Sequence, residues 1–490
     1  MARAVITLKM SKVGDRMMRF GEMLFPDRRL LWVVAVGFAV RLAVAPWTSW
    51  TYDTYPFYQG IVDTLAGIGP YGHMAYSYPP AFAFITAPFA WLLSLFLDPS
   101  HWAVFQPSLV DVGQVTKMIS PVVTHPGFNL AFKLPLIIAD YLTGVVLYHL
   151  VVMIRDREVA RRVFILWFLN PLVIFVSSIY GNFDVLAVFF TVLALYSMYR
   201  KMYLCAGLSV GLGVAFKLFP AYLGLFYFAF LLGLAIAEWR NSTRVVPNLR
   251  NLGSYVVGGA LGVSSIIITI YTDPSIMVFL TGRMGTNDMG GINIWGLMRN
   301  VNAFLSGGGL PDNTLSAVTV VSNYLLITIL FLILIYVFTM LRGGSKDSNS
   351  KQLLFGSMTV FVILLLFQPI THAHYLLWAL PFILLCSVYQ ERYELKAAML
   401  SVAGVVFWLA LQSYMAFFYP LAVFTGAVPV EQINQVVVDY YLGVNGLSSE
   451  GTRIIPTLIG VVALITALLP EASDPLWRLQ LRYRRWRDEA

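Results

Sequence analysis

The sequence from residue 131 to residue 162 reads AFKLPLIIADYLTGVVLYHLVVMIRDREVARR. Its first part, 131–153, is long and apolar enough to cross a bilayer as a helix, which takes about 20 such residues. The arginines that follow, at 155–162, mark the cytoplasmic side, because short loops on that side carry an excess of Lys and Arg. The same pairing of an apolar run with a basic cluster recurs along the chain and decides the fold class.

The composition supports a membrane protein. Hydrophobic residues make up 58% of the chain and charged residues 12%, and the mean hydropathy of +0.73 excludes an ordinary water-soluble core. The net charge of +8 is dispersed between apolar runs, so it fits anchoring beside anionic lipid headgroups and no nucleic-acid partner is expected. Both cysteines, Cys205 and Cys386, fall in apolar runs, so we expect neither a disulfide nor a metal cluster.

We predict an all-α polytopic protein with twelve spans that form one domain over 1–490. Residues 30–46 are expected to be the first span rather than a cleaved signal, because Arg41 interrupts the apolar run. The cytoplasmic ends are then 1–29 and 471–490. The other spans are expected at 131–153, 162–180, 183–200, 203–218, 219–238, 252–271, 317–341, 352–370, 374–390, 397–418 and 453–470.

The loops on the opposite side are long. A further crossing at 81–97 would move every later basic cluster outward, so this segment is predicted to be an interfacial or re-entrant helix. It lies in a first external loop, 47–130, which is rich in Tyr, Trp and Pro and suits helices resting at headgroup level. Further external loops are expected at 272–316 and 419–452.

Polar residues concentrate at this outer side. Asp53 follows the first span closely and is placed to act as a base near the membrane surface, although it could equally cap a short helix. Asp63 is a weaker rival. Lys133 and Asp140 are seven residues apart, which puts them on one face of a helix.

Two further outer junctions carry charge. In Gly181-Asn182-Phe183-Asp184, Asn182 could cap the next helix with Asp184 in its first turn, which is an alternative to a functional role. Lys217, before Phe219-Pro220, could contact a phosphate or extend to the headgroups.

His372 and His374 meet in a short connection between two spans. A pair of His with a distant Asp could bind a metal, although this spacing is weak for ligands. Arg283 is one of seven Lys and Arg residues outside the basic clusters, where insertion disfavours a cation.

Together these groups predict a cavity at the outer leaflet. Cations suit a lipid phosphate, aromatic rings suit a sugar face or an isoprenoid chain, and one carboxylate suits activation of a hydroxyl. These ingredients favour glycosyl transfer from a lipid phosphate.

The chain resembles the GT-C fold glycosyltransferases, and within them it is similar to the GPI mannosyltransferase I branch and the actinobacterial polyprenyl-phosphate-mannose mannosyltransferases. The resemblance implies a polyprenyl- or dolichyl-phosphate sugar donor, usually of mannose or glucose, and a lipid-linked or glycan acceptor on the outer face. Because Asp53 is followed by Thr54 and not by a paired acid, a metal-independent enzyme without cofactor is favoured. The residues that carry the resemblance are Asp53, Gly69-Pro70-Tyr71, Tyr78-Pro79-Pro80, Lys133 to Asp140, Asn170-Pro171, Gly181-Asn182-Phe183-Asp184, Lys217-Leu218-Phe219-Pro220 and His372 to Trp378.

Roles follow as expectations. Asp53 is the base of an inverting single displacement. The donor phosphate is expected to contact His374, Lys217 or Arg283, with His372 a second choice. The expected substrate contacts are Tyr52, Tyr78, Lys133, Asp184 and Trp378.

The expected location is a prokaryotic plasma membrane, with the endoplasmic reticulum as the alternative. Two other functions stay open: a lipid or solute transporter or flippase, and a noncatalytic assembly subunit. No two-fold repeat of the kind found in many carriers is evident between the halves of the sequence.

Overall fold

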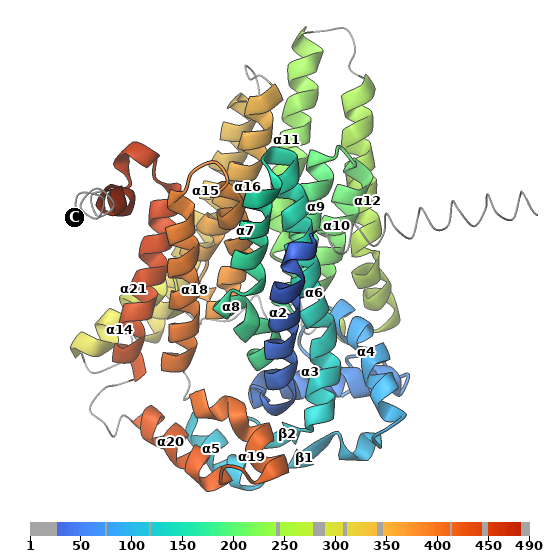
Figure 1. Cartoon of the computed structure of the whole chain (residues 1–490), viewed down its shortest axis with the longest axis vertical. Coiled ribbons are helices and arrows are strands. Elements are labelled where there is room, and N and C mark those ends of the chain that lie inside the picture. Colours follow the sequence, from blue (N-terminus) through green and yellow to red (C-terminus); the bar gives the residue numbers. More distant parts are fainter. Residues whose placement is uncertain are drawn as a thin grey trace, which may run out of the picture.

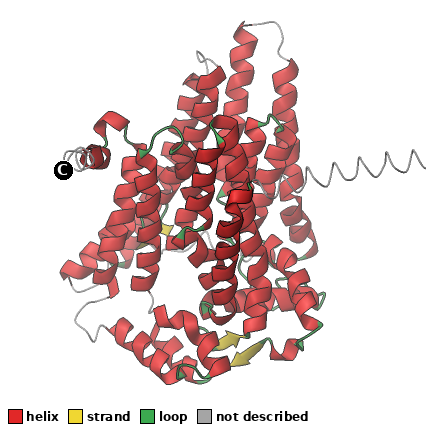
Figure 2. Ribbon diagram, in the orientation of Figure 1, coloured by secondary structure: helices red, strands yellow, loops and turns green. Residues whose placement is uncertain are grey.

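The computed structural model describes residues 27–73, 76–116, 119–241, 246–277, 290–306, 311–340, 346–411, 414–442 and 449–481. Within these ranges the chain is almost wholly helical, as predicted (Figure 2). Its strands form two short pairs. The antiparallel pair is β1 (Ala103–Phe105) with β2 (Val122–Thr124), and the parallel pair is β3 (Gly290–Gly291) with β4 (Ile370–Thr371).

Seven helices of the described part are long and apolar enough to cross a membrane, and one bent pair would make eight. The first combines η1 (Arg28–Leu30), α2 (Leu31–Val44) and η2 (Ala45–Trp47). The others are α6 (Pro126–Ile154), α11 (Pro220–Asn241), α12 (Val246–Thr272), α16 (Lys346–Phe367), α18 (Arg392–Leu411) and α21 (Ser449–Leu468).

Apart from the bent pair, which corresponds to 162–180, the other predicted spans correspond to shorter apolar helices. A helix of 16 residues such as α9 rises about 24 Å, less than the roughly 30 Å of a hydrocarbon core. A polytopic helical membrane protein is therefore supported, whereas the number twelve stays a prediction. The shorter helices are α9 (Asp184–Tyr199), α10 (Tyr203–Phe216), Thr314–Thr328 within α15 (Asp312–Met340), and Ala373–Cys386, made of η6 (Ala373–Trp378) and α17 (Leu380–Cys386).

The first predicted external loop and the last one meet at one end of the bundle, the lower end in Figure 1. There α5 packs on α20, β2 packs on α3 and α19, and Asn434 Nδ2 donates to the Ser108 carbonyl at 3.4 Å. The segment expected to be interfacial or re-entrant forms α4, which packs on α3 and α6. The elements of this end are α3 (Thr51–Leu65), α4 (Ala81–Ser94), η3 (Pro99–His101), α5 (Ser108–Thr116), η7 (Tyr414–Phe418), α19 (Tyr419–Thr425) and α20 (Val430–Leu442).

The basic clusters gather at the opposite end. Arg162 pairs with Glu394, and Arg161 pairs with Asp27 at 2.8 Å. Tyr199, next to the basic pair 200–201, donates its hydroxyl to the Ser350 carbonyl at 2.7 Å. Segments that the charge pattern assigned to one side of the membrane therefore lie together.

Below this basic end, the third predicted span is broken. It consists of α7 (Arg157–Phe168), α8 (Pro171–Ile174) and η4 (Phe175–Tyr180), a π-helical turn, and the halves are bent by 44°. Asn170 caps α8 by accepting from the Leu172 amide at 3.0 Å and donates to Ser401 Oγ on α18 at 2.8 Å. Gly181 ends η4 with φ +80°, where a Cβ would lie 2.6 Å from Lys133 Cε. The break directs the chain after Tyr180 back into the bundle.

Helices α10 and α12 approach each other backbone to backbone. Glycines stand at the contact, as in membrane helices that pack closely through small residues. A Cβ on Gly207 would lie 1.9 Å from the Tyr255 carbonyl oxygen, and one on Gly258 would lie 2.1 Å from that of Leu204. This contact holds α10 in place, and Lys217 follows directly after its last residue.

Candidate active site

A fully buried carboxylate, Asp184, is the centre of a polar cluster. It lies in the first turn of α9, and its amide donates to Asn182 Oδ1 at 3.0 Å, so the expected local capping is present. Asn182 is thus the capping residue, and the Asp184 side chain has other partners. Lys217 pairs with Oδ1, Trp378 Nε1 donates to Oδ2 at 2.9 Å, and His374 Nε2 lies 3.9 Å from Oδ2. The sequence-predicted Asp184, Lys217, His374 and Trp378 are therefore brought together.

Aromatic rings enclose the Lys217 ammonium. Its Nζ lies 4.1 Å from the centre of the Tyr375 ring and 5.5 Å from the centres of Phe183 and Trp378. Such contacts stabilise a cation that is partly removed from water. Trp378 is in turn stacked on Phe219, with 4.1 Å between ring centres. Lys217 is thus held inside the bundle rather than extended to the headgroups.

Asp53 lies beside this cluster, in the first turn of α3, and is half-buried. Two tyrosine hydroxyls donate to its carboxylate, Tyr180 to Oδ2 and Tyr78 to Oδ1 at 3.3 Å. The Tyr180 ring is 5.3 Å from the ring of His374. Tyr180 therefore connects Asp53 with the Asp184 cluster, a link that the sequence analysis missed although the residue stands directly before Gly181.

Tyr71 and the segment 76–80 set the position of Tyr78. Tyr71 donates its hydroxyl to the Tyr78 carbonyl at 2.7 Å, and Tyr76 donates to the Pro79 carbonyl at 2.9 Å. Burial raises the pKa of both Tyr71 and Tyr76 above the ordinary value of 10.0, so both remain donors at neutral pH. The Tyr78 hydroxyl is consequently directed at Asp53 by a loop that is itself anchored.

The two histidines stack nearly parallel, with 5.4 Å between ring centres and 6° between planes. His374 also packs on Tyr180 and Trp408, and Tyr375 contacts both histidine rings. Across the ranges that the structure describes, no three His, Cys, Asp or Glu side chains are grouped as metal ligands.

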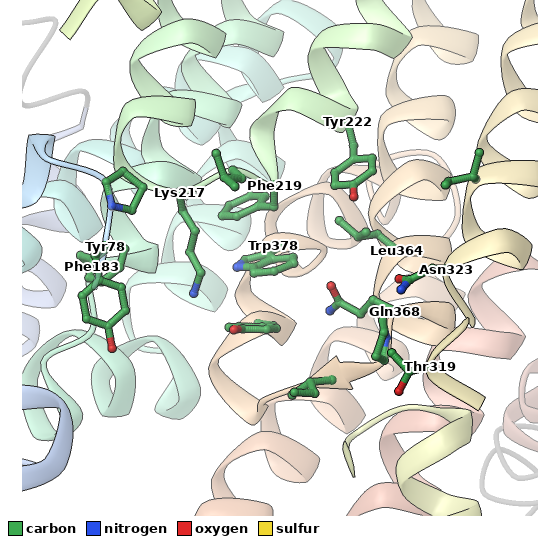
Figure 3. Close-up of a pocket in the computed structure, with 16 residues that line it drawn as sticks. Tyr78, Phe183, Lys217, Phe219, Tyr222, Thr319, Asn323, Leu364, Gln368 and Trp378 are labelled. Atoms are coloured by element: carbon green, nitrogen blue, oxygen red, sulfur yellow. The ribbon is translucent and has the colours of Figure 1, made fainter. Parts of the chain in front are cut away.

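A cavity of about 640 Å³ opens beside these residues (Figure 3). Tyr78, Phe183 and Lys217 form one wall, and the Lys217 ammonium points into the space. The opposite wall comes from α15 and the end of α16 and carries Thr319, Asn323 and Gln368. The remaining lining residues are Pro79, Leu218, Phe219, Tyr222, Ile327, Leu364, Pro369, Ile370, Tyr375 and Trp378.

Lys133 and Asp140 both lie on α6, as expected, but they have separate partners. Lys133 is fully buried, and its ammonium donates to main-chain carbonyls of η2, η4 and the segment after η2. Asp140 lies about two turns further along the same helix and pairs with Arg41 at 3.2 Å, both fully buried. Neither lines the cavity. Lys133 and Arg41 each bond to groups more than 40 residues away in the sequence. The spacing of Lys133 and Asp140 could not reveal these partners.

The other expected contacts are dispersed. Tyr52 is 51% exposed, and neither it nor the rival acid Asp63 lines the cavity. Asp63 is buried in the first-loop helix and pairs with His73 at 2.7 Å. Arg283 lies outside the described residues.

Comparisons with known proteins give one similarity along most of the chain. No family model matches. The chain is 22% identical over 382 residues to GPI mannosyltransferase 1 of Saccharomyces cerevisiae (strain ATCC 204508 / S288c). The matched part covers 75% of this chain and 81% of the yeast protein. The similarity is thus to a mannosyltransferase, and it extends over most of both proteins.

Proposed function

We propose that this chain is a membrane glycosyltransferase. It moves a hexose, with mannose the first choice, from a polyprenyl- or dolichyl-phosphate donor to an acceptor hydroxyl on the extracytoplasmic face. One observation carries the proposal: Lys217 at the cavity wall supplies a cation, and Tyr78 of the same wall bonds to the Asp53 carboxylate. The proposed phosphate contact thus lies in the cavity wall, and the proposed base lies outside the lining residues, bonded to Tyr78 of that wall. The similarity to GPI mannosyltransferase 1 supports the same reaction.

The cavity walls suit such a donor. Its apolar rim includes Leu218 and Ile327, which are 48% and 64% exposed on the outside of the bundle. An isoprenoid chain would lie at this rim, where it stays in contact with lipid, while the phosphate reaches Lys217. His374 lies behind Lys217, on the shared carboxylate of Asp184. The Lys217 ammonium and the His374 imidazole would oppose the charge that develops on the departing phosphate.

The chemistry is a single displacement with inversion at the anomeric carbon. Asp53 takes the proton of the acceptor hydroxyl as the oxygen forms its bond to that carbon. The bond from the carbon to the phosphate oxygen breaks and leaves the lipid phosphate. Because a phosphate is already a good leaving group, no second carboxylic acid is required, unlike hydrolysis of an ordinary glycosidic bond. The proposed location is a prokaryotic plasma membrane, with the endoplasmic reticulum as the alternative.

The test uses purified protein in nanodiscs with radiolabelled polyprenyl-phosphate-mannose and a membrane-lipid extract as the source of acceptor. Asp53→Asn is expected to reduce transfer by about 10²- to 10⁴-fold, the usual contribution of a general base. Donor binding should persist, because the Asn amide can bond to both tyrosines: its oxygen accepts from one hydroxyl and its NH2 donates to the other. Asp111→Asn, on an exposed position of the same outer end, is the control and should retain activity.

Full activity of Asp53→Asn would remove Asp53 from the mechanism. Absence of any labelled product from wild-type protein, repeated with polyprenyl-phosphate-glucose, would favour a transporter. In that case labelled lipid or solute would cross vesicles without cleavage of the donor.

A further inference from the structure

We propose that the wall opposite Lys217 recognises the sugar of the donor, and that Gln368 is its specificity-determining residue. This inference rests on the proposed function and deepens it. The Gln368 side chain points into the cavity, toward Trp378 (Figure 3). Asn323 and Thr319 of α15 add polar atoms to the same wall. Gln368, Asn323 and Thr319 lie across the cavity from the Lys217 ammonium. The cavity leaves room for a hexose between these side chains and the ammonium.

The hydrogen-bond network determines which end of the Gln368 amide faces the cavity. Thr371 is fully buried and donates its only hydroxyl hydrogen to the Leu365 carbonyl at 2.7 Å. Its Oγ1 therefore acts as an acceptor toward its other neighbours, Gln368 Nε2 at 3.0 Å and Asn293 Nδ2 at 3.2 Å. With Nε2 turned to Thr371, Gln368 presents its carbonyl oxygen, Oε1, to the cavity.

The backbone that carries Gln368 is equally well anchored. Asn293 is fully buried, donates Nδ2 to the Gln368 carbonyl at 2.7 Å and accepts from the Gly296 amide at 2.6 Å. The pairing of β3 with β4 adds a second attachment, since a Cβ on Gly291 would lie 1.9 Å from the Thr371 carbonyl oxygen. The side chain is thus preorganised before any ligand arrives, which lowers the entropy cost of binding.

The direction of this amide selects the kind of group it can bind. A carbonyl oxygen accepts hydrogen bonds, so it attracts a sugar hydroxyl and repels a phosphate oxygen. An amide is also neutral, so it can lie near the donor's anion without the repulsion that a carboxylate would exert. The two walls therefore divide the donor: Lys217 takes the phosphate, and Gln368 takes a hydroxyl of the hexose. A site that bonds a hydroxyl discriminates strongly against analogues that lack it.

Binding of two lipids separates these roles. Polyprenyl-phosphate-mannose carries both groups, whereas polyprenyl phosphate has the phosphate and no sugar. Gln368→Met keeps the length of the side chain but loses the acceptor, and it is expected to weaken binding of the mannosylated lipid by about tenfold. Its affinity for polyprenyl phosphate should stay at the wild-type level. Lys217→Met should weaken binding of both lipids.

Thr371→Val is a second variant, because it keeps the shape of Thr371 and removes the atom that orients the amide. It should show the same selective loss as Gln368→Met, although a smaller one. Gln432→Met, on an exposed position of α20, is the matched control. Thermal unfolding in detergent confirms that each variant is folded before binding is measured.

The outcomes distinguish this inference from the proposed function. Suppose that wild-type protein transfers mannose, and that Gln368→Met either binds both lipids like wild type or loses affinity for both equally. Gln368 then does not recognise the sugar, and this inference is refuted while the proposed function stands. If wild-type protein binds neither lipid and transfers no sugar, the proposed function falls with it.

Discussion

Replacing Lys133 by Met is expected to destabilise the protein and also to disturb the proposed active site. The Lys133 ammonium donates to four main-chain carbonyls, those of Ala45 at 3.1 Å, Thr48 at 2.5 Å, Ser178 at 2.9 Å and Ile179 at 3.1 Å. These carbonyls belong to two separate segments of the chain. Lys133 therefore joins them.

The magnitude follows from what Met keeps and what it loses. Met fills the space of the Lys stem, so little packing is lost. Three N–H donors disappear, each worth about 1.5 to 3 kcal/mol in a charged hydrogen bond, while the cost of burying the ammonium, several kcal/mol, is recovered. The net loss of folding free energy is expected to be about 3 kcal/mol.

Activity should fall further than stability alone explains. One joined segment leads into the helix of Asp53, and the other ends at Tyr180, which donates to that carboxylate. A shift of about 1 Å between them would cost on the order of 10²-fold in rate. The measurement is mannose transfer at a temperature where the variant is folded, together with thermal unfolding in detergent. Lys201→Met, at an exposed turn, is the control.

Wild-type melting temperature and wild-type transfer in Lys133→Met would refute this reasoning. Such a result would mean that the carbonyls find other donors and that the two segments stay aligned without the ammonium.

Two further predictions concern stability. Gly258→Ala should lower the melting temperature and Gly253→Ala should not, because a Cβ at Gly258 meets the Leu204 carbonyl at 2.1 Å, whereas nothing lies within 4 Å at Gly253 of the same helix. Asp474→Asn should cost about 3 kcal/mol, because it leaves the buried Lys396 without its carboxylate, and thermal unfolding of wild type and variant measures this loss. Burial raises the pKa of Asp474, but Lys396 and other donors outweigh it and hold that pKa below 3.8, so its contribution is complete above that pH and is lost on acidification. Unfolding measured between about pH 2 and 6 should therefore show a loss of stability below about pH 4 in wild type that Asp474→Asn lacks, and equal curves would contradict the assignment.

Much of the fold was predictable because membrane insertion depends on local properties. An apolar run and a basic cluster are each recognised from a short stretch of sequence. The long helices could therefore be predicted, and so could the basic end of the bundle, where Arg162 pairs with Glu394. The number of crossings is less local. Whether a short helix such as α9 or α10 crosses the bilayer depends on the elements that pack around its ends. The hydropathy of its own residues does not describe those elements.

The candidate site was predictable to the extent that its residues are costly in a membrane. Asp184, Lys217 and His374 stood out for that reason, and the structure brings them together. Lys133 stood out equally, yet its acceptors are main-chain carbonyls, which no residue pattern marks. Gln368 was missed because a single amide at the end of an apolar span is ordinary until its partners are known.

The break in the third predicted span has a consequence for how the protein is made. Asn170 lies in the middle of that span, and the hydroxyl that accepts from its amide belongs to Ser401, 231 residues later in the chain. During synthesis α7 and α8 enter the bilayer long before α18 has been made. The hydrogen bond from the Asn170 amide to Ser401 therefore cannot form until then. In the same way, the hydrogen bond that Asp184 accepts cannot form until Trp378, 194 residues later in the chain, has been made. The amino-terminal half is therefore an incomplete bundle until the carboxy-terminal helices that carry Trp378 and Ser401 have been made.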